Sequence, residues 1–147
     1  MATVTPVVLK LTQVHGVVKV RGSAGDTGTI TLATILKKSG ETASTPTANI
    51  KTIFWSLGTG CAATISRNST VIWTFGTDAA SGWFDFAGWA DNEFNTSDVV
   101  IAFTGAATGV VVLELAKVSG YGNEQHQIAP LDTAEGGSVK PAGGSLI

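Results

Sequence analysis

The chain has 147 residues, of which 44% are hydrophobic and only 14% are charged, and its formal net charge is −2. This length suits one domain with a core of its own. A surface with so few charges is typical of a protein that packs against neighbours, because little repulsion keeps copies apart. Nucleic-acid binding is disfavoured, since Lys37 and Lys38 form the only adjacent basic pair in the chain.

Disulfide-linked, secreted and membrane proteins are also disfavoured. Cys61 is the only cysteine, which excludes a disulfide or a thiolate metal cluster within one chain, and we expect it to be a small buried hydrophobe. The first residues do not resemble a signal peptide, and no apolar run approaches the ~18 residues of a membrane helix. We therefore expect a soluble protein of a reducing compartment with no membrane partner.

Alternation of apolar and polar residues with a period of two runs through the chain. The apolar positions are mostly β-branched or aromatic, as half-buried strands prefer, and short clusters of turn residues separate the runs. The runs predict strands at 7–14, 17–20, 27–36, 50–57, 61–66, 70–75, 83–86, 98–105 and 109–120. No segment has the 3.6-residue period of a helix. About eight to nine short strands without helices predict an all-β fold, an antiparallel β-sandwich or jelly roll.

The character of the sequence changes after Gly120. Residues 121–147 are rich in glycine and proline and alternate little, so they cannot bury enough apolar surface to fold alone. We assign residues 1–120 to the β-sandwich domain and 121–147 to an extended C-terminal arm that orders on a neighbouring subunit, although a floppy tail would have the same composition. The apolar anchors of such an arm would be Ile128, Leu131, Leu146 and Ile147.

Few residues could carry catalysis. With two histidines and one cysteine, no acid, base and nucleophile set is evident, so we expect neither an enzyme nor a cofactor nor a bound metal. Four carboxylates fall within fourteen residues, those of Asp85, Asp91, Glu93 and Asp98. A glycosidase or a calcium loop would use such groups. Their spacing matches no calcium loop, however, and we expect the Asp and Asn residues of 91–98 to be turn formers and caps.

The segment 82–94 holds five aromatic residues. On a strand, Phe84 and Phe86 share one face and Trp83 lies on the other, so we expect both phenylalanines in the core and Trp83 exposed. Trp83, Trp89 and Phe94 could then contact a partner subunit at an interface, where tryptophan is enriched and charges are few. Stacking of Trp83 or Trp89 on a sugar ring stays open as the alternative.

Four stretches, KLTQVHGVVKVRGSAG, TISRNSTVIWTF, NTSDVVIAFTG and AKVSGYG, resemble small virion structural proteins of tailed bacteriophages, especially those of marine myoviruses that infect cyanobacteria. They span most of residues 10–122. The resemblance implies a β-rich component of the capsid or its attachments that is present in many copies. It brings no functional residues with it, and it covers neither 82–94 nor the segment beyond Tyr121.

We therefore expect a capsid decoration or cement protein, assembled into the virion in the host cytoplasm. Its partners would be the major capsid protein or other virion subunits, which it would bridge on the outer shell. A homo-oligomer would fit this role, with a trimer favoured. A structural component of the neck, tail or fibre base is the first alternative. A carbohydrate-binding β-sandwich module is the second, from a different class.

Overall fold

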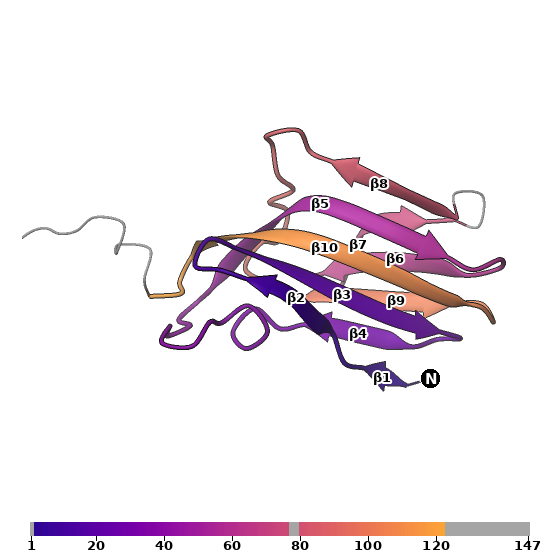
Figure 1. Cartoon of the computed structure of the whole chain (residues 1–147), viewed down its shortest axis with the longest axis horizontal. Helices are drawn as coiled ribbons and strands as arrows, with labels where there is room; N and C mark the ends of the chain where they lie inside the picture. Colours follow the sequence, from indigo (N-terminus) through magenta and orange to yellow (C-terminus); the bar gives the residue numbers. More distant parts are fainter. Residues whose placement is uncertain (1, 77–79, 123–147) are drawn as a thin grey trace, which may run out of the picture.

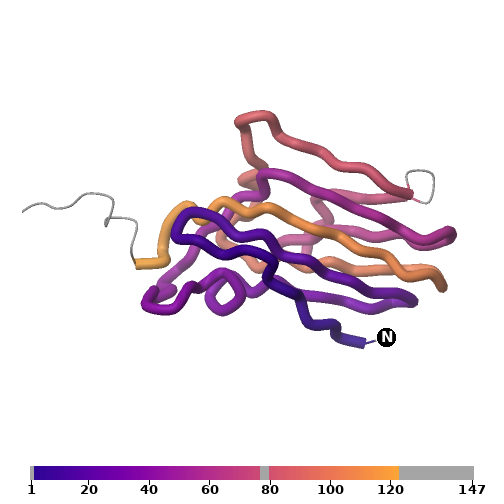
Figure 2. Tube along the Cα trace, in the orientation of Figure 1, coloured from indigo at the N-terminus to yellow at the C-terminus, as the bar shows by residue number. Residues whose placement is uncertain are grey.

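The computed structural model describes residues 2–76 and 80–122, which form ten strands and no helix (Figure 1). The strands are β1 (Thr3–Val4), β2 (Val7–Leu11), β3 (His15–Ser23), β4 (Thr27–Ile30), β5 (Thr47–Leu57), β6 (Ala62–Arg67), β7 (Thr70–Phe75), β8 (Ser81–Asp85), β9 (Val99–Thr104) and β10 (Thr108–Ser119). They form two packed sheets, sheet A with the order β1-β4-β9-β6-β7 and sheet B with the order β2-β3-β10-β5-β8. Figure 2 follows the course of the chain through these strands. The all-β sandwich predicted from the alternation is confirmed.

The strand pairing is that of a jelly roll. Antiparallel pairs join β3 to β10, β4 to β9, β5 to β8 and β6 to β7, so the pairs are nested in the sequence as in one long hairpin. Successive pairs lie in alternate sheets, and further antiparallel pairing of β10 with β5 and of β9 with β6 completes each sheet. The short strands β1 and β2 precede this eight-stranded unit and add an edge to each sheet, β1 in parallel with β4.

The core lies between the sheets and follows the alternation of the strands. On β9, Val99, Ile101 and Phe103 are fully buried, and β10 buries every second residue from Gly109 to Lys117. Cys61 is buried as expected, and burial raises the pKa of its thiol. The intervening residues stand on the two outer faces, where a partner can reach them.

The strand predicted over 27–36 is shorter than expected. β4 covers only its first four residues, and the backbone then turns, with the amide of Ile35 donating to the carbonyl of Thr31 at 2.8 Å. Leu32 and Leu36 are nevertheless fully buried, from the turn rather than from a strand. Their spacing of four residues suits either conformation, so the apolar pattern alone could not separate the two.

The strand predicted over 7–14 is also interrupted. β2 ends at Leu11, and in the turn that follows Thr12 Oγ1 accepts hydrogen bonds from the amides of Val14 and His15 at 3.2 and 3.0 Å. A register shift at Leu9 marks a bulge in β2 and leaves this side chain exposed. A bulge distorts an edge strand and makes it a poorer template for further pairing.

The prediction that Phe84 and Phe86 belong to the core needs correction. Phe84 is 42% exposed, and Phe86 is only partly buried against the core. β8 and β7 are edge strands of opposite sheets, so side chains between them cover an open side of the sandwich instead of its centre. Phe84 packs there on Trp73 and on Phe86, with ring centroids 5.2 and 4.8 Å apart.

The sandwich extends past the boundary predicted at residue 120. Tyr121 is fully buried in the core, and the carbonyls of Gly120 and Tyr121 accept hydrogen bonds from Ser44 and Thr42 at 2.7 and 3.2 Å. Gly120 has a φ of 86°, and an added Cβ would approach a neighbouring carbonyl oxygen to 2.5 Å, so only glycine fits. The arm beyond Gly122, including the predicted anchors Ile128, Leu131, Leu146 and Ile147, lies outside the described residues.

Candidate functional site

Arg67, at the end of β6, is a fully buried cation. It donates hydrogen bonds to the carbonyl oxygens of Ala48 (2.7 Å), Asn95 (3.1 Å) and Ser97 (2.6 Å). Burial lowers the pKa of its guanidinium, and nearby carboxylates counter that shift. The guanidinium takes the place of water for three backbone carbonyls that would otherwise be costly to bury. It therefore joins the start of β5 to the connection between β8 and β9.

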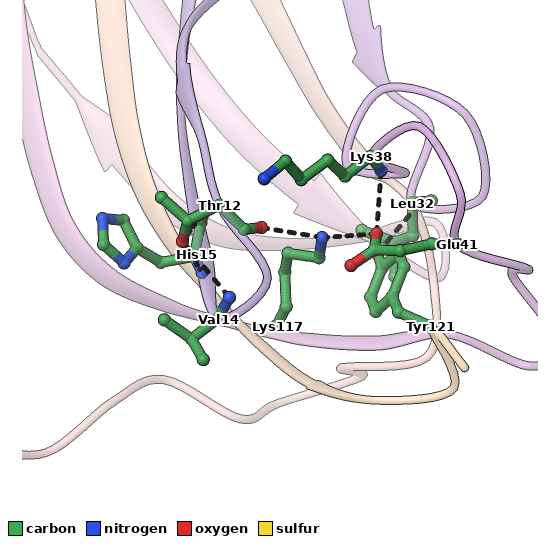
Figure 3. A network of polar contacts seen from close by, with 8 residues as sticks. All are labelled: Thr12, Val14, His15, Leu32, Lys38, Glu41, Lys117 and Tyr121. Atoms are coloured by element: carbon green, nitrogen blue, oxygen red, sulfur yellow. Dashed lines mark hydrogen bonds and ion pairs between the residues drawn. The ribbon is translucent and has the colours of Figure 1, made fainter. Parts of the chain in front are cut away.

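Lys117 is a second buried cation, on the inner face of β10 (Figure 3). Its Nζ lies 2.7 Å from Glu41 Oε1, and both side chains are excluded from solvent. The same Nζ donates to the carbonyl of Thr12 at 2.9 Å, and Glu41 Oε1 also accepts from the amide of Lys38 at 2.8 Å. The pair therefore joins β10, the turn between β2 and β3, and the connection between β4 and β5.

Tyr121 completes this buried group. Its hydroxyl donates to the carbonyl of Leu32 at 2.8 Å, and Lys117 Nζ lies 4.6 Å from the centroid of its ring (Figure 3). Burial raises the pKa of the Tyr121 hydroxyl above its ordinary value, and the negative charge of Glu41 adds to that effect. Because these groups bind parts of the chain itself and are shielded from solvent, we interpret the cluster as structural.

The carboxylates between residues 85 and 98 are engaged in turns and loop contacts. Asp85 and Asp91 each accept a hydrogen bond at 2.9 Å from the amide two residues later. Asp98 accepts from the amide of Leu32 at 3.0 Å. Asp91 thus forms a local turn, as the sequence predicts, whereas Asp98 binds an amide 66 positions away in the chain. Within residues 2–76 and 80–122, no group of three or more His, Cys, Asp and Glu side chains could hold a metal ion.

The outer face of sheet B carries a row of side chains that crosses all five strands. The strand register joins Trp83 to Phe54, Phe54 to Val112, Val112 to Lys19, and Lys19 to Val7. We call these five residues the Trp83 row. Trp83 is 63% exposed and Phe54 is 43% exposed, and their rings stack with centroids 6.3 Å apart and planes at 23°. Exposed aromatic rings grouped in this way are typical of contact surfaces.

Charges divide between the two sides of this face. The row next to the Trp83 row consists of Lys10, Val17, Glu114, Thr52 and Asp85. The cation of this row, Lys10, lies on β2, close to Lys19 and Arg21 on β3. The carboxylates of the row, Glu114 and Asp85, lie on β10 and β8. Glu114 Oε1 accepts a hydrogen bond from Thr52 Oγ1 at 3.1 Å. Lys51, at a bulge in β5, adds a cation beside the acidic side.

Trp89 and Phe94 lie in the connection between β8 and β9. Trp89 is 81% exposed and Phe94 is 37% exposed. Gly88, with a φ of 91°, makes the turn that leads to Trp89, whose amide donates to the carbonyl of Phe86 at 2.9 Å. All three interface residues predicted in the described part of the chain are therefore solvent-exposed, but only Trp83 belongs to the row across sheet B.

The other members of the Trp83 row were not predicted. Alternation over 50–57 places Phe54 opposite the buried Ile53, so its exposure could have been inferred from the sequence. Its contact with Trp83 could not have been inferred, because the two residues are 29 positions apart in the sequence and meet only through the pairing of β5 with β8. The same holds for Val7, which reaches this face only through the pairing of β2 with β3.

No protein-family model matches the chain, and no curated protein and no solved structure is similar to it. In the part of the chain that the structure describes, no helix is long and apolar enough to cross a membrane.

Replacing Lys117 with methionine should strongly destabilise the fold. The Glu41 carboxylate would stay buried without the lysine, which costs about 3–5 kcal/mol of unfolding free energy, measurable by urea denaturation. The double variant Lys117→Met/Glu41→Met should recover much of this loss, because no charge of the pair remains buried. Equal stability of the single and double variants would contradict this account.

Tyr121 should resist ionisation in the folded protein. It is the only tyrosine, so phenolate absorbance reports on it alone. Its pKa is raised on folding, so its contribution to stability is fully present below about pH 10, the unfolded value, and is lost as pH rises above it. We expect no native phenolate near pH 10, and a weaker alkaline loss of stability in Tyr121→Phe. Chain unfolded in urea should titrate near pH 10, and a native phenolate there with the β-sheet spectrum intact would disprove the prediction.

Proposed function

We propose that this protein is a structural component of a tailed-phage virion, a decoration or cement protein that binds the outer shell and bridges neighbouring subunits. The observation that carries the proposal is the stacked, exposed pair of Trp83 and Phe54 on the outer face of sheet B. Tryptophan is among the residues that contribute most to binding at protein interfaces. This exposed aromatic pair is therefore suited to contact with another subunit.

The outer face of sheet A supports the same proposal in a different way. Its strand register aligns Thr3, Thr27, Ala102, Thr64 and Thr74 in one row across the sheet. None of these side chains is charged. A face with such an uncharged row can pack against a neighbour with little cost of burying charge.

The jelly-roll topology and the sequence resemblance also support the proposal, but they are less specific than the exposed aromatic pair. Jelly rolls occur in viral capsid proteins and in lectins, so this topology suits a virion subunit without identifying one. The four stretches that resemble tailed-phage structural proteins include the strands β3, β7 and β9. The proposal assigns contact with a neighbouring subunit to residues 123–147, which lie outside the described residues.

A position in the neck, tail or fibre base is the alternative within the virion. The number of copies per particle separates the two, since a shell protein repeats with the capsid lattice and a neck protein does not.

A carbohydrate-binding module is the second candidate, and one observation favours it. Trp83 and Asp85 are alternate residues on the outer face of β8, so an exposed indole lies beside a carboxylate. Aromatic rings can stack on the apolar face of a sugar, and a carboxylate can accept hydrogen bonds from its hydroxyl groups.

Removal of residues 123–147 should abolish binding to the particle while the jelly roll stays folded. The expected wild-type result is many copies per purified virion by quantitative mass spectrometry, and rebinding to particles stripped of the protein. The truncated chain should keep the wild-type unfolding transition, which serves as the control for folding. Normal decoration by the truncated chain would refute the role of the arm, and absence of the protein from virions would refute the proposed function.

The carbohydrate hypothesis predicts binding to a glycan array that is lost in Trp83→Ala. Loss of one stacking ring should weaken binding by about tenfold or more, given the roughly 1–3 kcal/mol that stacking on an aromatic ring contributes. Val71→Ala, an exposed change on β7 of sheet A, is the matched control and should bind as the wild type does. A blank array would count against this candidate.

A further inference from the structure

We propose that the outer face of sheet B binds a second copy of this chain about a two-fold axis, with Trp83 of each copy seated in a hollow of the other. The proposal rests on the interface role suggested above for Trp83. It does not rest on the assignment to a virion, so the two can fail separately.

The hollow lies at the opposite border of the face from Trp83. It has a volume of about 450 Å³ and is lined by Val4, Thr5, Val7, Lys19, Arg21, Gly22, Ser23, Asp26 and Thr108. It opens where the chain passes from β1 in sheet A to β2 in sheet B. This volume lies within the range of ligand pockets, which starts at roughly 300 Å³.

The projecting ring and one edge of the hollow belong to the same row. Trp83 is at one end of the Trp83 row, and Val7 and Lys19, which line the hollow, are at the other. Four strand spacings of about 4.8 Å separate the two ends by about 19 Å. One copy cannot bring its own Trp83 to its own hollow, but two copies can exchange them.

The chemistry of the hollow suits an indole. Val4 and Val7 offer an apolar wall, and the side chains of Lys19 and Arg21 can lie over an aromatic face as cation–π partners. Neither cation forms an ion pair with any residue in 2–76 or 80–122. Asp26, the acid in the lining, already accepts a hydrogen bond from the amide of Ser23 at 3.0 Å.

A two-fold axis parallel to the strands places Trp83 of each copy over the hollow of the other. Such an axis exchanges the borders of sheet B, so β8 of one copy lies over β2 of the other and β5 lies over β3. Trp83 then meets Val7, and Phe54 meets Lys19. In the neighbouring row Asp85 meets Lys10, which pairs the acidic side of the face with the basic side. The contact closes as a dimer, because each copy supplies one ring and one hollow.

The size of the face is sufficient for a stable pair. The five strands of sheet B hold 5, 9, 12, 11 and 5 residues, 42 in all, and at about 3.3 Å along and 4.8 Å across per residue they cover about 670 Å². Two such faces give about 1,300 Å², within the roughly 1,200–2,000 Å² that specific interfaces bury in total. The dimer would replace the trimer expected from the sequence as the basic unit.

Sedimentation equilibrium of the full chain tests the proposal. We expect a dimer for the wild type, and a dissociation constant about thirtyfold or more higher for Trp83→Ala, as for the loss of an aromatic anchor. Val71→Ala, which changes an exposed side chain of sheet A, is the matched control and should stay dimeric. Glu114→Gln should tighten the pair, because it removes like charges that face each other near the axis. A monomeric wild type, or a Trp83→Ala variant as dimeric as the wild type, would overturn the proposal.

Cross-linking tests the two-fold arrangement itself. In the variant Lys10→Cys/Asp85→Cys the two new thiols lie at opposite borders of one copy but face each other between copies, and the native Cys61 is buried. A bis-maleimide that spans about 10 Å, the separation of packed sheets, should give a covalent dimer. Each single variant should stay uncross-linked. A ladder of larger products would show head-to-tail association and would refute the two-fold pair.

The outcomes separate this inference from the proposed function. A dimer with the expected cross-link in a protein absent from virions would leave the pairing intact and overturn the virion assignment. A protein that decorates shells but sediments as a monomer, or that uses Trp83 only to bind a glycan, would overturn the pairing and leave the other proposal standing.

Discussion

The register of β10 is the constraint on which the rest of the structure depends. This twelve-residue strand is the centre of sheet B and pairs with β3 on one side and β5 on the other. A slip of one residue would turn Val111 and Leu113 to the outside and Val112 to the core. The same register sets the order of side chains on the outer face. The buried core and the Trp83 row are therefore two results of one pairing pattern.

Two buried cations stabilise that register where the loops meet. Lys117 is at the inner face of β10 and is held by Glu41 and by the carbonyl of Thr12, so sliding β10 would leave a charge buried without its partners. Arg67 does the same for β6, through three backbone carbonyls. Replacement of a buried ion pair by apolar residues often costs little, and the value of these contacts lies in the single arrangement that satisfies them. The β10 register, and with it the outer face, is held in place from one end.

A face fixed in this way is suited to repeated contact with other subunits. Its aromatic rings stand on strands rather than on loops, so little conformational entropy is lost when a partner covers them. Sheet A offers a threonine-rich face of different chemistry on the opposite side. If copies pair through sheet B, the outer face of sheet A is left for other partners, such as the shell in the proposed virion role. In that role, weak contacts repeated over many copies would add up to firm attachment.

Alternation along the chain determined the fold class, because each strand shows its own buried face in its own sequence, as Val99, Ile101 and Phe103 do. It also placed Trp83 on the outside, and residue type predicted the turn at Asp91. It did not determine that Phe84 covers an open side of the sandwich, or that Trp83, Phe54 and Val7 share a row, since these depend on which strands are neighbours. Lys117 and Arg67 occupy inward positions of the alternation. The burial of these two charges is explained only by their hydrogen-bond and ion-pair partners, which come from loops far away in the sequence. Burial of one strand is a local property of the sequence, whereas a surface shared by five strands is decided by tertiary pairing across the whole chain.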